Sequence, residues 1–416
     1  MAVTDILKVL YAPHKTFKGI IQNPRYLGVF ILLIIFVIAQ IGSSYLVGSR
    51  EYLEQTMPAA AQGDLWTNNA TLWTASPSVA VTNNYVDFIN GTYYGTSSVQ
   101  FAINNATSIQ MALPNLDGSV NCSSDGFKNM TISVKIVTPD VKPENVSLYL
   151  YSGSGSNFFY YDLTNAFSSN AVNVWNNITV PVGSGNWVSS NTAASWTAIT
   201  SLRMDFTWSS SSTVDVRVDG LFFRGVYQTY VEFNGGIAPF LAQATLSGFA
   251  PFIFEWIVLT GLMYVIIKGL KGSVVWKPLM VALGFALVTL VIQAIIIVAL
   301  YTTLPNLYYP LEVLAGVPGE AFNAASSVIS NQIAIVALAG SIVQIAVYIW
   351  TVGLAAIITR DITGGVRIAE QSGMGTPVID ATTVPEVRGF GWMKSFLVAG
   401  ASFVLTLIIL SFVLGV

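Results

Sequence analysis

Five long apolar runs constrain this chain more than any other feature of its sequence. Each is nearly free of charged residues and is long enough to cross about 30 Å of hydrocarbon as a helix. Charged residues make up only 9% of the whole chain, against roughly a quarter in a typical soluble protein. We therefore expect an α-helical membrane bundle with five transmembrane helices. The runs cover residues 26–47, 249–267, 278–301, 333–358 and 396–414.

Basic residues alternate between the segments that connect these runs. Lys and Arg precede the first run and occur again in the connections 268–277 and 359–394, whereas the connection 302–332 contains neither. Because short cytoplasmic loops are enriched in Lys and Arg, the N-terminus is predicted to be cytoplasmic and the C-terminus extracytoplasmic. The sequence thus predicts a multi-pass protein of the cell membrane, with the long segment after the first run outside.

The segment 52–232 differs sharply in composition from the apolar runs. It is rich in Ser, Thr, Asn and Gly, and its apolar residues alternate with polar ones, as in half-buried strands. Turn clusters separate the alternating runs, which favours an antiparallel β-sandwich or jelly roll. This all-β domain would be inserted between the first transmembrane helix, 26–48, and the remaining helical part, 240–416. The alternating runs are 130–137, 146–151, 157–163, 172–182, 202–208 and 213–223.

About residues 95–228 of this segment resemble a carbohydrate-binding-module jelly roll, and the galactose-binding-like superfamily more generally. The similarity lies in residues 175–182 (WNNITVPV), 196–206 (WTAITSLRMDF) and 214–223 (VDVRVDGLFF), which look like the second half of such a jelly roll. It implies a non-catalytic binding domain, commonly for glycans. The expected partners are therefore glycans or envelope proteins, with no nucleic acid and no cofactor.

Aromatic and acidic residues of the segment have two readings each. The aromatic residues could stack on sugar rings, or they could fill the core and anchor the domain at the membrane interface. The acidic ones could bind calcium, or form a ladder of charges with Arg203 and Arg217 across neighbouring strands. The aromatic candidates are Trp66, Trp73, Tyr93, Tyr94, Tyr160, Tyr161 and Trp187. The acidic candidates are Asp205, Asp215 and Asp219.

Asn-X-Ser/Thr sequons occur only in the segment predicted to lie outside. Their position agrees with that orientation and predicts a glycoprotein where the host has the machinery. The sequon asparagines are Asn69, Asn90, Asn105, Asn121, Asn129, Asn145 and Asn177.

Residues 1–25 read as a cytoplasmic amphipathic arm that Pro13 divides into two short helices. Residues 13–20 (PHKTFKGI), followed by Asn23-Pro24 and an apolar helix, resemble the N-terminal motif of prokaryotic Yip-domain (Ypt-interacting-protein type) membrane proteins, and residues 350–356 (WTVGLAA) fit their fourth span. The resemblance implies five spans with the N-terminus inside. The Asp-Leu-X-Gly-Pro motif of eukaryotic members is absent, so GTPase binding is not carried over.

Glu255 is the only carboxylate well inside an apolar run. An intramembrane acid indicates a proton or cation site by default, with Gln293 and Gln344 as possible partners. The alternative for Glu255 is a position about two turns from the outer surface, where it snorkels or hydrogen-bonds to a neighbouring helix. For Gln293 and Gln344 the alternative is hydrogen bonding between helices. The first reading predicts a transporter or channel subunit whose β domain is a lid or docking module.

Catalysis is not expected. His14 is the only histidine, so no Ser-His-Asp or Cys-His site can form in the β segment. The favoured hypothesis is a non-enzymatic membrane scaffold that displays a binding domain outside the cell.

Overall fold

The computed structural model describes residues 2–153, 155–183, 185–364 and 389–414. Most of the predicted cytoplasmic connection 359–394 lies outside these ranges. The chain divides into two units. The helical unit comprises Met1–Arg50, Tyr230–Pro305 and Asn331–Val416, and the β unit comprises Glu51–Thr229 and Asn306–Ser330.

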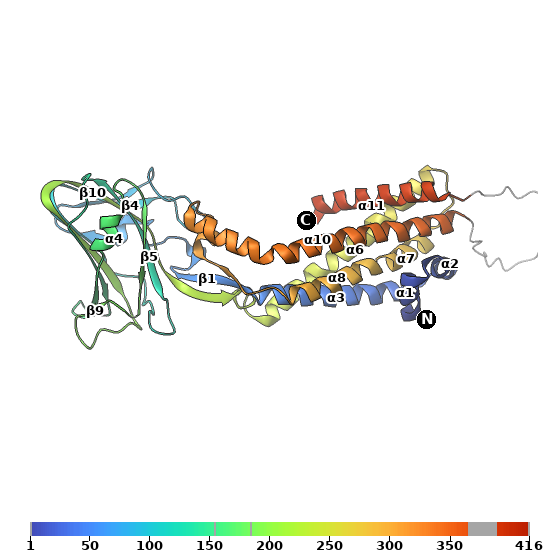
Figure 1. Cartoon of the computed structure of the whole chain (residues 1–416), viewed down its shortest axis with the longest axis horizontal. Coiled ribbons are helices and arrows are strands. Elements are labelled where there is room, and N and C mark those ends of the chain that lie inside the picture. Colours follow the sequence, from blue (N-terminus) through green and yellow to red (C-terminus); the bar gives the residue numbers. More distant parts are fainter. Residues whose placement is uncertain (1, 154, 184, 365–388, 415–416) are drawn as a thin grey trace, which may run out of the picture. The chain divides into compact units, whose positions relative to one another are not determined.

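In its described residues the helical unit contains five helices that are long and apolar enough to cross a membrane, counting α7 and α8 as one (Figure 1). The N-terminal arm forms two short helices that break at Pro13, where the ring cannot continue the preceding helix. α7 and α8 meet at Leu287, so the third apolar run is not one continuous helix. The helices are α1 (Ala2–Tyr11), α2 (Pro13–Gln22), α3 (Leu27–Gly48), α5 (Tyr230–Phe233), α6 (Ile237–Gly269), α7 (Trp276–Ala286), α8 (Val288–Tyr301), α10 (Glu320–Thr363) and α11 (Trp392–Leu414).

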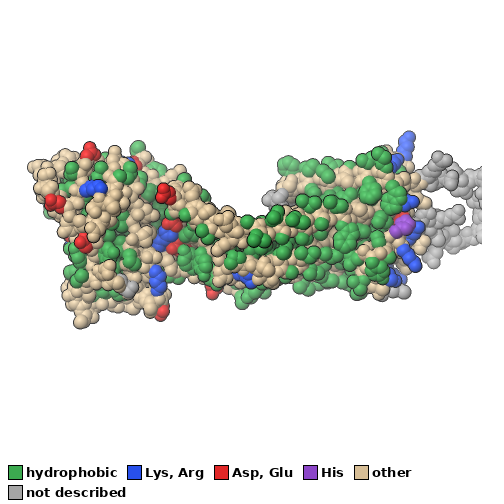
Figure 2. Space-filling model, viewed as in Figure 1, with side chains coloured by type: hydrophobic (Ala, Val, Ile, Leu, Met, Phe, Trp, Pro, Cys, Tyr) green, Lys and Arg blue, Asp and Glu red, His purple; other side chains and the backbone are tan. Residues whose placement is uncertain are grey.

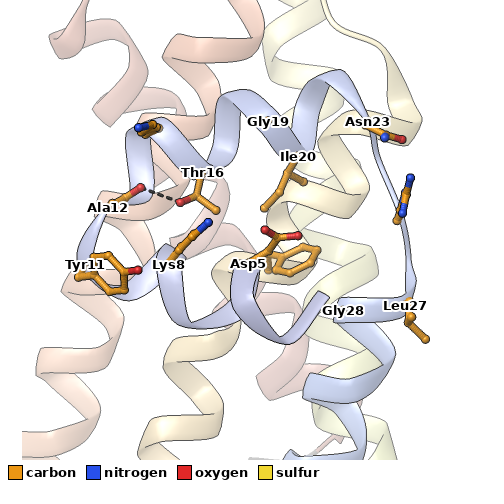
Figure 3. A pocket seen from close by; sticks show the side chains of 13 residues that line it. Asp5, Lys8, Tyr11, Ala12, Thr16, Gly19, Ile20, Asn23, Leu27 and Gly28 are labelled. Carbon is orange, nitrogen blue, oxygen red and sulfur yellow. Dashed lines mark hydrogen bonds between the residues drawn. The ribbon is translucent and has the colours of Figure 1, made fainter. Parts of the chain in front are cut away.

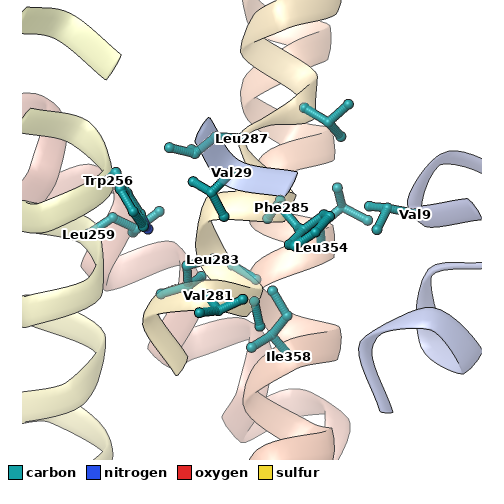
Figure 4. Close-up of a cluster of buried hydrophobic side chains, with 14 of the residues drawn as sticks. Val9, Val29, Trp256, Leu259, Val281, Leu283, Phe285, Leu287, Leu354 and Ile358 are labelled. Carbon is teal, nitrogen blue, oxygen red and sulfur yellow. The ribbon is translucent and has the colours of Figure 1, made fainter. Parts of the chain in front are cut away.

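Buried apolar side chains form the core of the helical unit (Figure 4), and two glycines allow its helices to approach closely. Trp256 of α6 is buried and donates a hydrogen bond from Nε1 to the carbonyl oxygen of Met280 at 2.7 Å. A Cβ at Gly28 would lie 2.1 Å from the ring of Phe285, and one at Gly284 would lie 2.6 Å from Val29. The helices therefore approach as closely as they do only because these two positions lack a side chain.

α10 carries a stripe of exposed apolar side chains. Isoleucines and a leucine at alternating spacings of three and four residues are 60–80% exposed. Soluble proteins rarely leave so long an apolar stripe in water. The residues are Ile335, Leu338, Ile342, Ile345 and Ile349.

Among the residues that the structure describes, eleven strands of the β unit are hydrogen-bonded into one sheet, antiparallel except for the pairing of β1 with β11. The core lies on its inner face and includes Phe101, Met204 and Phe206. The strands are β1 (Glu51–Met57), β2 (Thr74–Ala75), β3 (Ala80–Asn84), β4 (Ser98–Leu113), β5 (Asn129–Thr138), β6 (Asn145–Tyr151), β7 (Phe158–Asp162), β8 (Asn176–Pro181), β9 (Val188–Ser189), β10 (Ser201–Thr229) and β11 (Leu307–Tyr309).

The long strand β10 joins the two parts of this sheet. It pairs with β4 over most of its length, while its first part also pairs with β6 and its later part with β5 and then β1. The two strands predicted at 202–208 and 213–223 are therefore halves of a single strand. The predicted ladder between neighbouring strands is wrong for that reason, because Arg203 and Arg217 follow each other along one strand.

The connection after the third apolar run belongs to the β unit. β11 pairs with β1, and the short helix α9 (Leu311–Ala315) packs on Tyr94 and Phe222. Glu54 accepts a hydrogen bond from the backbone N–H of Leu311 at 2.7 Å. A stretch that reads as a loop without basic residues is thus an integral part of the sheet.

Candidate functional site

Strands β6, β7 and β10 present a continuous aromatic surface on the outward side of the sheet. Tyr149 lies opposite Tyr160 of β7 on one side and opposite Arg203 of β10 on the other, and Tyr151 lies opposite Phe158. Because side chains alternate along a strand, these positions face outward while Leu148, Leu150, Leu202 and Met204 point into the core. Tyr149, Tyr151, Phe158, Tyr160 and Arg203 are called the aromatic face below.

The rings of the aromatic face contact one another and remain half-buried. The Tyr149 ring centroid lies 5.3 Å from that of Tyr160 and 5.6 Å from that of Phe158. Tyr151 and Phe158 are 5.7 Å apart. Such spacings are those of favourable aromatic pairs, so the rings support each other, and each keeps part of its surface exposed.

The guanidinium of Arg203 lies over the ring of Tyr149. Its guanidinium carbon lies 4.0 Å from the centroid of Tyr149 and its Nη2 lies 3.0 Å from the carboxylate of Asp205. The Gln110 amide, with its oxygen turned toward the guanidinium, accepts from Nε at 3.0 Å. Partial burial raises the pKa of Asp205, although Arg203 and Gln110 oppose this effect. The guanidinium is therefore fixed by a ring, a carboxylate and an amide.

This arrangement suits a flat ligand that has apolar faces and polar edges. The rings offer apolar area, while Arg203, Asp205, Gln110 and the tyrosine hydroxyls can exchange hydrogen bonds with hydroxyl groups. A pyranose ring has this character, because its C–H faces are apolar and its hydroxyls lie around the edge. The site has one cation and one carboxylate, so nothing in it selects for a strongly charged ligand.

Of the aromatic residues singled out in the sequence, the structure places Tyr160 on the aromatic face. Trp66, Trp73 and Tyr94 are buried, with at most 4% of their surface exposed. Tyr161 and Trp187 are partly buried against the β-unit core, with ring centroids 5.0 Å apart. Tyr93 is half-buried beside the cluster that contains Tyr94. These six therefore pack or support the sheet and do not line the aromatic face.

Three of the four rings of the aromatic face, and Arg203 as a ligand contact, are absent from the candidates that sequence reasoning produced. The alternation in 145–151 (NVSLYLY) places both tyrosines on one face. What the sequence does not contain is the register that sets Tyr149 between Tyr160 and Arg203.

The three acidic residues considered for calcium lie apart and have other partners. Asp205 pairs with Arg203, and Asp215 accepts from Gln100 at 2.9 Å and lies 3.3 Å from Arg217. Asp219 is fully buried beside Asp64. No group of three or more potential metal ligands occurs among the residues that the structure describes.

Asp64 and Asp219 form a buried carboxyl pair surrounded by hydrogen-bond donors. The backbone N–H of Gly220 donates to both, at 2.7 and 2.9 Å, and that of Ile89 donates to Asp219 at 2.6 Å. Burial and the neighbouring charge of Asp64 raise the pKa of Asp219 to about 9. Burial also raises the pKa of Asp64. Since two adjoining carboxyl groups in a low dielectric do not both ionise readily, the pair retains one proton at neutral pH.

In the helical unit, Glu255 is buried on α6, and its Oε1 has no hydrogen-bond partner within the described part of the chain. Gln344 is exposed on α10 and donates to the hydroxyl of Tyr348 at 2.6 Å. No hydrogen bond between Glu255 and either Gln293 or Gln344 is found in the described ranges. The three residues do not form one site.

Six of the seven sequon asparagines are exposed, and Asn129 is half-buried on β5. The exposed ones are accessible for glycosylation, and none of them is a residue of the aromatic face. The exposed asparagines are Asn69, Asn90, Asn105, Asn121, Asn145 and Asn177.

Comparison with protein families gave no match, and neither did comparison with curated proteins. Solved structures similar to the chain include the family 11 carbohydrate-binding module of Clostridium thermocellum in complex with a β-1,3-1,4-mixed-linked tetrasaccharide, at 10% identity and TM-score 0.26 over 41% of this chain and 94% of that one. A family 30 module from a cellulosomal cellulase of the same organism matches at 8% identity and TM-score 0.30, over 42% and 97%. A family 28 module specific for non-crystalline cellulose matches at 12% and 0.26, over 42% and 99%. At these scores the similarity assigns no function, and the ligand is inferred from the side chains of the aromatic face.

Proposed function

We propose that this chain is a non-enzymatic, membrane-anchored binding protein whose β unit binds glycans outside the cell through the aromatic face. The observation that carries the proposal is the set of four adjoining rings, with Arg203 lying over one of them, on the outward side of β6, β7 and β10. A fully buried set of rings would belong to the hydrophobic core. This set is half-exposed and is flanked by fixed polar groups, the combination that ligand sites use for affinity and orientation.

The helical unit supplies the anchor in this proposal. Its five long apolar helices and the exposed stripe of α10 match a lipid environment better than water. Lys and Arg side chains gather at the end of this unit where α1 and α2 lie (Figure 2), which supports a cytoplasmic position for that end. The N-terminal resemblance to Yip-domain membrane proteins agrees with a scaffold of five spans.

A glycan array probed with the full chain in lipid nanodiscs tests the ligand class. We expect saturable binding to neutral oligosaccharides and loss of that signal in Tyr160→Ala. Tyr85→Ala is the matched control, because Tyr85 is 68% exposed in the same unit and is not part of the aromatic face. A folded chain that ignores every glycan but captures an envelope protein through the same residues would replace the glycan assignment with a protein partner.

Membrane anchoring needs its own test. The chain should remain in the membrane fraction during extraction at alkaline pH, and protease added outside intact cells should cleave the β unit. Release by alkali would contradict the anchor, whatever the glycan array shows.

One observation favours a second function. Glu255 is buried in α6 with an unpaired carboxylate oxygen, and such residues mark ion or proton paths in membrane helices. If the helical unit moves an ion, Glu255→Gln should abolish the flux in proteoliposomes and leave glycan binding unchanged. Equal flux in wild type, variant and empty vesicles would remove this function.

A further inference from the structure

The N-terminal arm encloses a hollow in the helical unit (Figure 3). Its volume is about 760 Å³, and α1, α2, the following turn, the start of α3 and Phe285 of α7 line it. The arm is held firmly around this space, because Val9, Phe17 and Ile21 are buried in the core of the unit. The hollow is thus a built part of the fold.

Basic residues dominate the charge of the hollow. Lys8, Lys15 and Arg25 line it together with a single carboxylate, Asp5. Among the described residues, none forms a salt bridge with these three basic side chains. Three unpaired cations around one space repel each other, so an anion that enters it would be stabilised.

Apolar groups line the remainder of the hollow. Ile20, Leu27 and Phe285 contribute side chains, and Gly28 brings the backbone of α3 against the Phe285 ring. Leu27 is 64% exposed at the first turn of α3, one of the helices long and apolar enough to span a membrane. An anionic head and an apolar tail could therefore be accommodated side by side.

We propose that this hollow binds the phosphate headgroup of an anionic glycerophospholipid from the surrounding leaflet. The phosphate lies among Lys8, Lys15 and Arg25, and the acyl chains leave along Leu27 and Phe285. Basic pockets next to spanning helices on the cytoplasmic side are suited to such headgroups. The inference rests on the membrane anchoring proposed above and is independent of the glycan ligand.

Native mass spectrometry of the full chain in detergent tests the proposal, with phosphatidylglycerol and phosphatidylcholine titrated in parallel. We expect one phosphatidylglycerol per chain to be retained and phosphatidylcholine to bind far more weakly. The combined variant Lys8→Gln, Lys15→Gln and Arg25→Gln should weaken phosphatidylglycerol binding by about a hundredfold, since each basic residue near an anionic lipid contributes about a factor of five.

Two further variants separate the hollow from general surface charge. Lys268→Gln, Lys271→Asn and Lys277→Gln remove the same number of charges outside the hollow and should leave lipid binding unchanged; Asn suits the positive φ of Lys271. Gly19→Phe fills the hollow without removing any charge. No heavy atom lies within 4 Å of a Cβ at Gly19, so this variant should fold and still lose the lipid.

Two results would overturn the proposal. One is equal lipid retention by the wild type and the triple hollow variant. The other is displacement of the lipid by glycerol 1-phosphate at the lipid's own concentration, which would assign the hollow to a water-soluble phosphate. If alkaline extraction releases the chain, the membrane anchor itself fails; if the chain stays in the membrane without lipid selectivity, only the hollow's assignment fails.

Discussion

Arg203 and Arg224 lie on the same strand, β10, and show how surroundings decide the role of one residue type. Arg203 keeps 28% of its side chain exposed, lies over Tyr149 and has one carboxylate partner, Asp205. Arg224 keeps only 10% exposed and lies between two carboxylates, with Nε 2.9 Å from Glu54 and Nη2 2.7 Å from Glu312. Arg203 therefore has N–H groups that can still donate to a ligand, whereas the N–H groups of Arg224 donate to carboxylates inside the fold.

The carboxylates around Arg224 connect distant parts of the chain. Glu54 comes from β1, and Glu312 comes from α9 in the segment after the third apolar run. Although burial raises the pKa of Glu312, the Arg224 guanidinium outweighs that effect and holds it below its usual value. We infer that Arg224 fixes the α9 segment to the sheet, whereas Arg203 fixes a surface for recognition.

The largest expected effect is that of Arg224→Ala. The buried Glu54 and the partly buried Glu312 would lose their cation, which should cost about 3–5 kcal/mol of β-unit stability. Hydrogen exchange of the β1 and β10 amides in the full chain measures this loss. Adding Glu54→Gln and Glu312→Gln should recover much of the lost stability, because the uncompensated charges are gone. Unchanged amide protection in Arg224→Ala alone would contradict a structural role for Arg224.

The buried pair of Asp64, which follows β1, and Asp219 on β10 has no salt-bridge partner among the described residues and should respond to pH in the opposite sense to an ion pair. The pKa of Asp219 is raised to about 9 in the folded state, so the native state binds more protons than the unfolded one. Its stabilising contribution is complete below about pH 4 and is lost as the pH rises toward 9, at up to about 1.4 kcal/mol per pH unit.

Asp219→Asn should remove this pH dependence, because the amide can donate to Asp64 permanently while its oxygen still accepts from Ile89. Thermal unfolding of the full chain followed by tryptophan fluorescence at pH 5 and pH 8 measures the difference. We expect the variant to be more stable than the wild type at pH 8. A wild type that gains stability from pH 5 to pH 8 through this pair would show that the carboxyls do not share a proton.

Arg203→Ala should give the converse of Arg224→Ala. Glycan affinity should fall about tenfold, since a fixed guanidinium and its contact with Tyr149 are lost. Stability should change by no more than about 0.5 kcal/mol, as for most surface substitutions. Titration calorimetry and hydrogen exchange on the same preparation separate the two effects, and a large stability loss would place Arg203 with Arg224 as a structural residue.

Asp205→Asn is expected to have the smallest effect. The amide can still hold Arg203, so glycan affinity at pH 7 should change by less than about threefold. In the wild type, protonation of Asp205 removes the same charge and should weaken binding by no more than that factor as the pH falls. Because the pKa of Asp205 is raised, this occurs at a higher pH than for an ordinary aspartate. Glycan affinity of the variant should not weaken in this way at low pH. Identical pH profiles of glycan affinity in the wild type and the variant would show that Asp205 does not contribute to the site.

The long helices could be predicted from the sequence because length and apolarity are local properties. All five predicted runs fall within helices of the structure to within a residue, the third being divided between α7 and α8 at Leu287. The predicted strands at 130–137, 146–151 and 157–163 coincide with β5, β6 and β7 within a residue or two. Strand β4 was not predicted, since polar residues 104–108 (NNATS) interrupt its alternation.

The candidate site was largely beyond the reach of the sequence. Alternation shows that Tyr149 and Tyr151 share a face, but neighbours across the sheet depend on register. Large aromatic residues such as Trp66 and Trp73 are candidates for stacking on a ligand, yet their large apolar surface favours burial. The α9 segment is held to the sheet by Glu54 and Arg224, which lie far from it in the chain. No local sequence pattern predicts that contact.

The most direct test of the central claim is a calorimetric titration of the full chain in nanodiscs with the oligosaccharide that binds best on the array. The comparison is between wild type, the double variant Tyr149→Ala/Tyr160→Ala and the control Tyr85→Ala. We predict one site per chain in the wild type and the control, and no measurable binding in the double variant. Binding that survives in a folded double variant would contradict the assignment of the aromatic face as the glycan site.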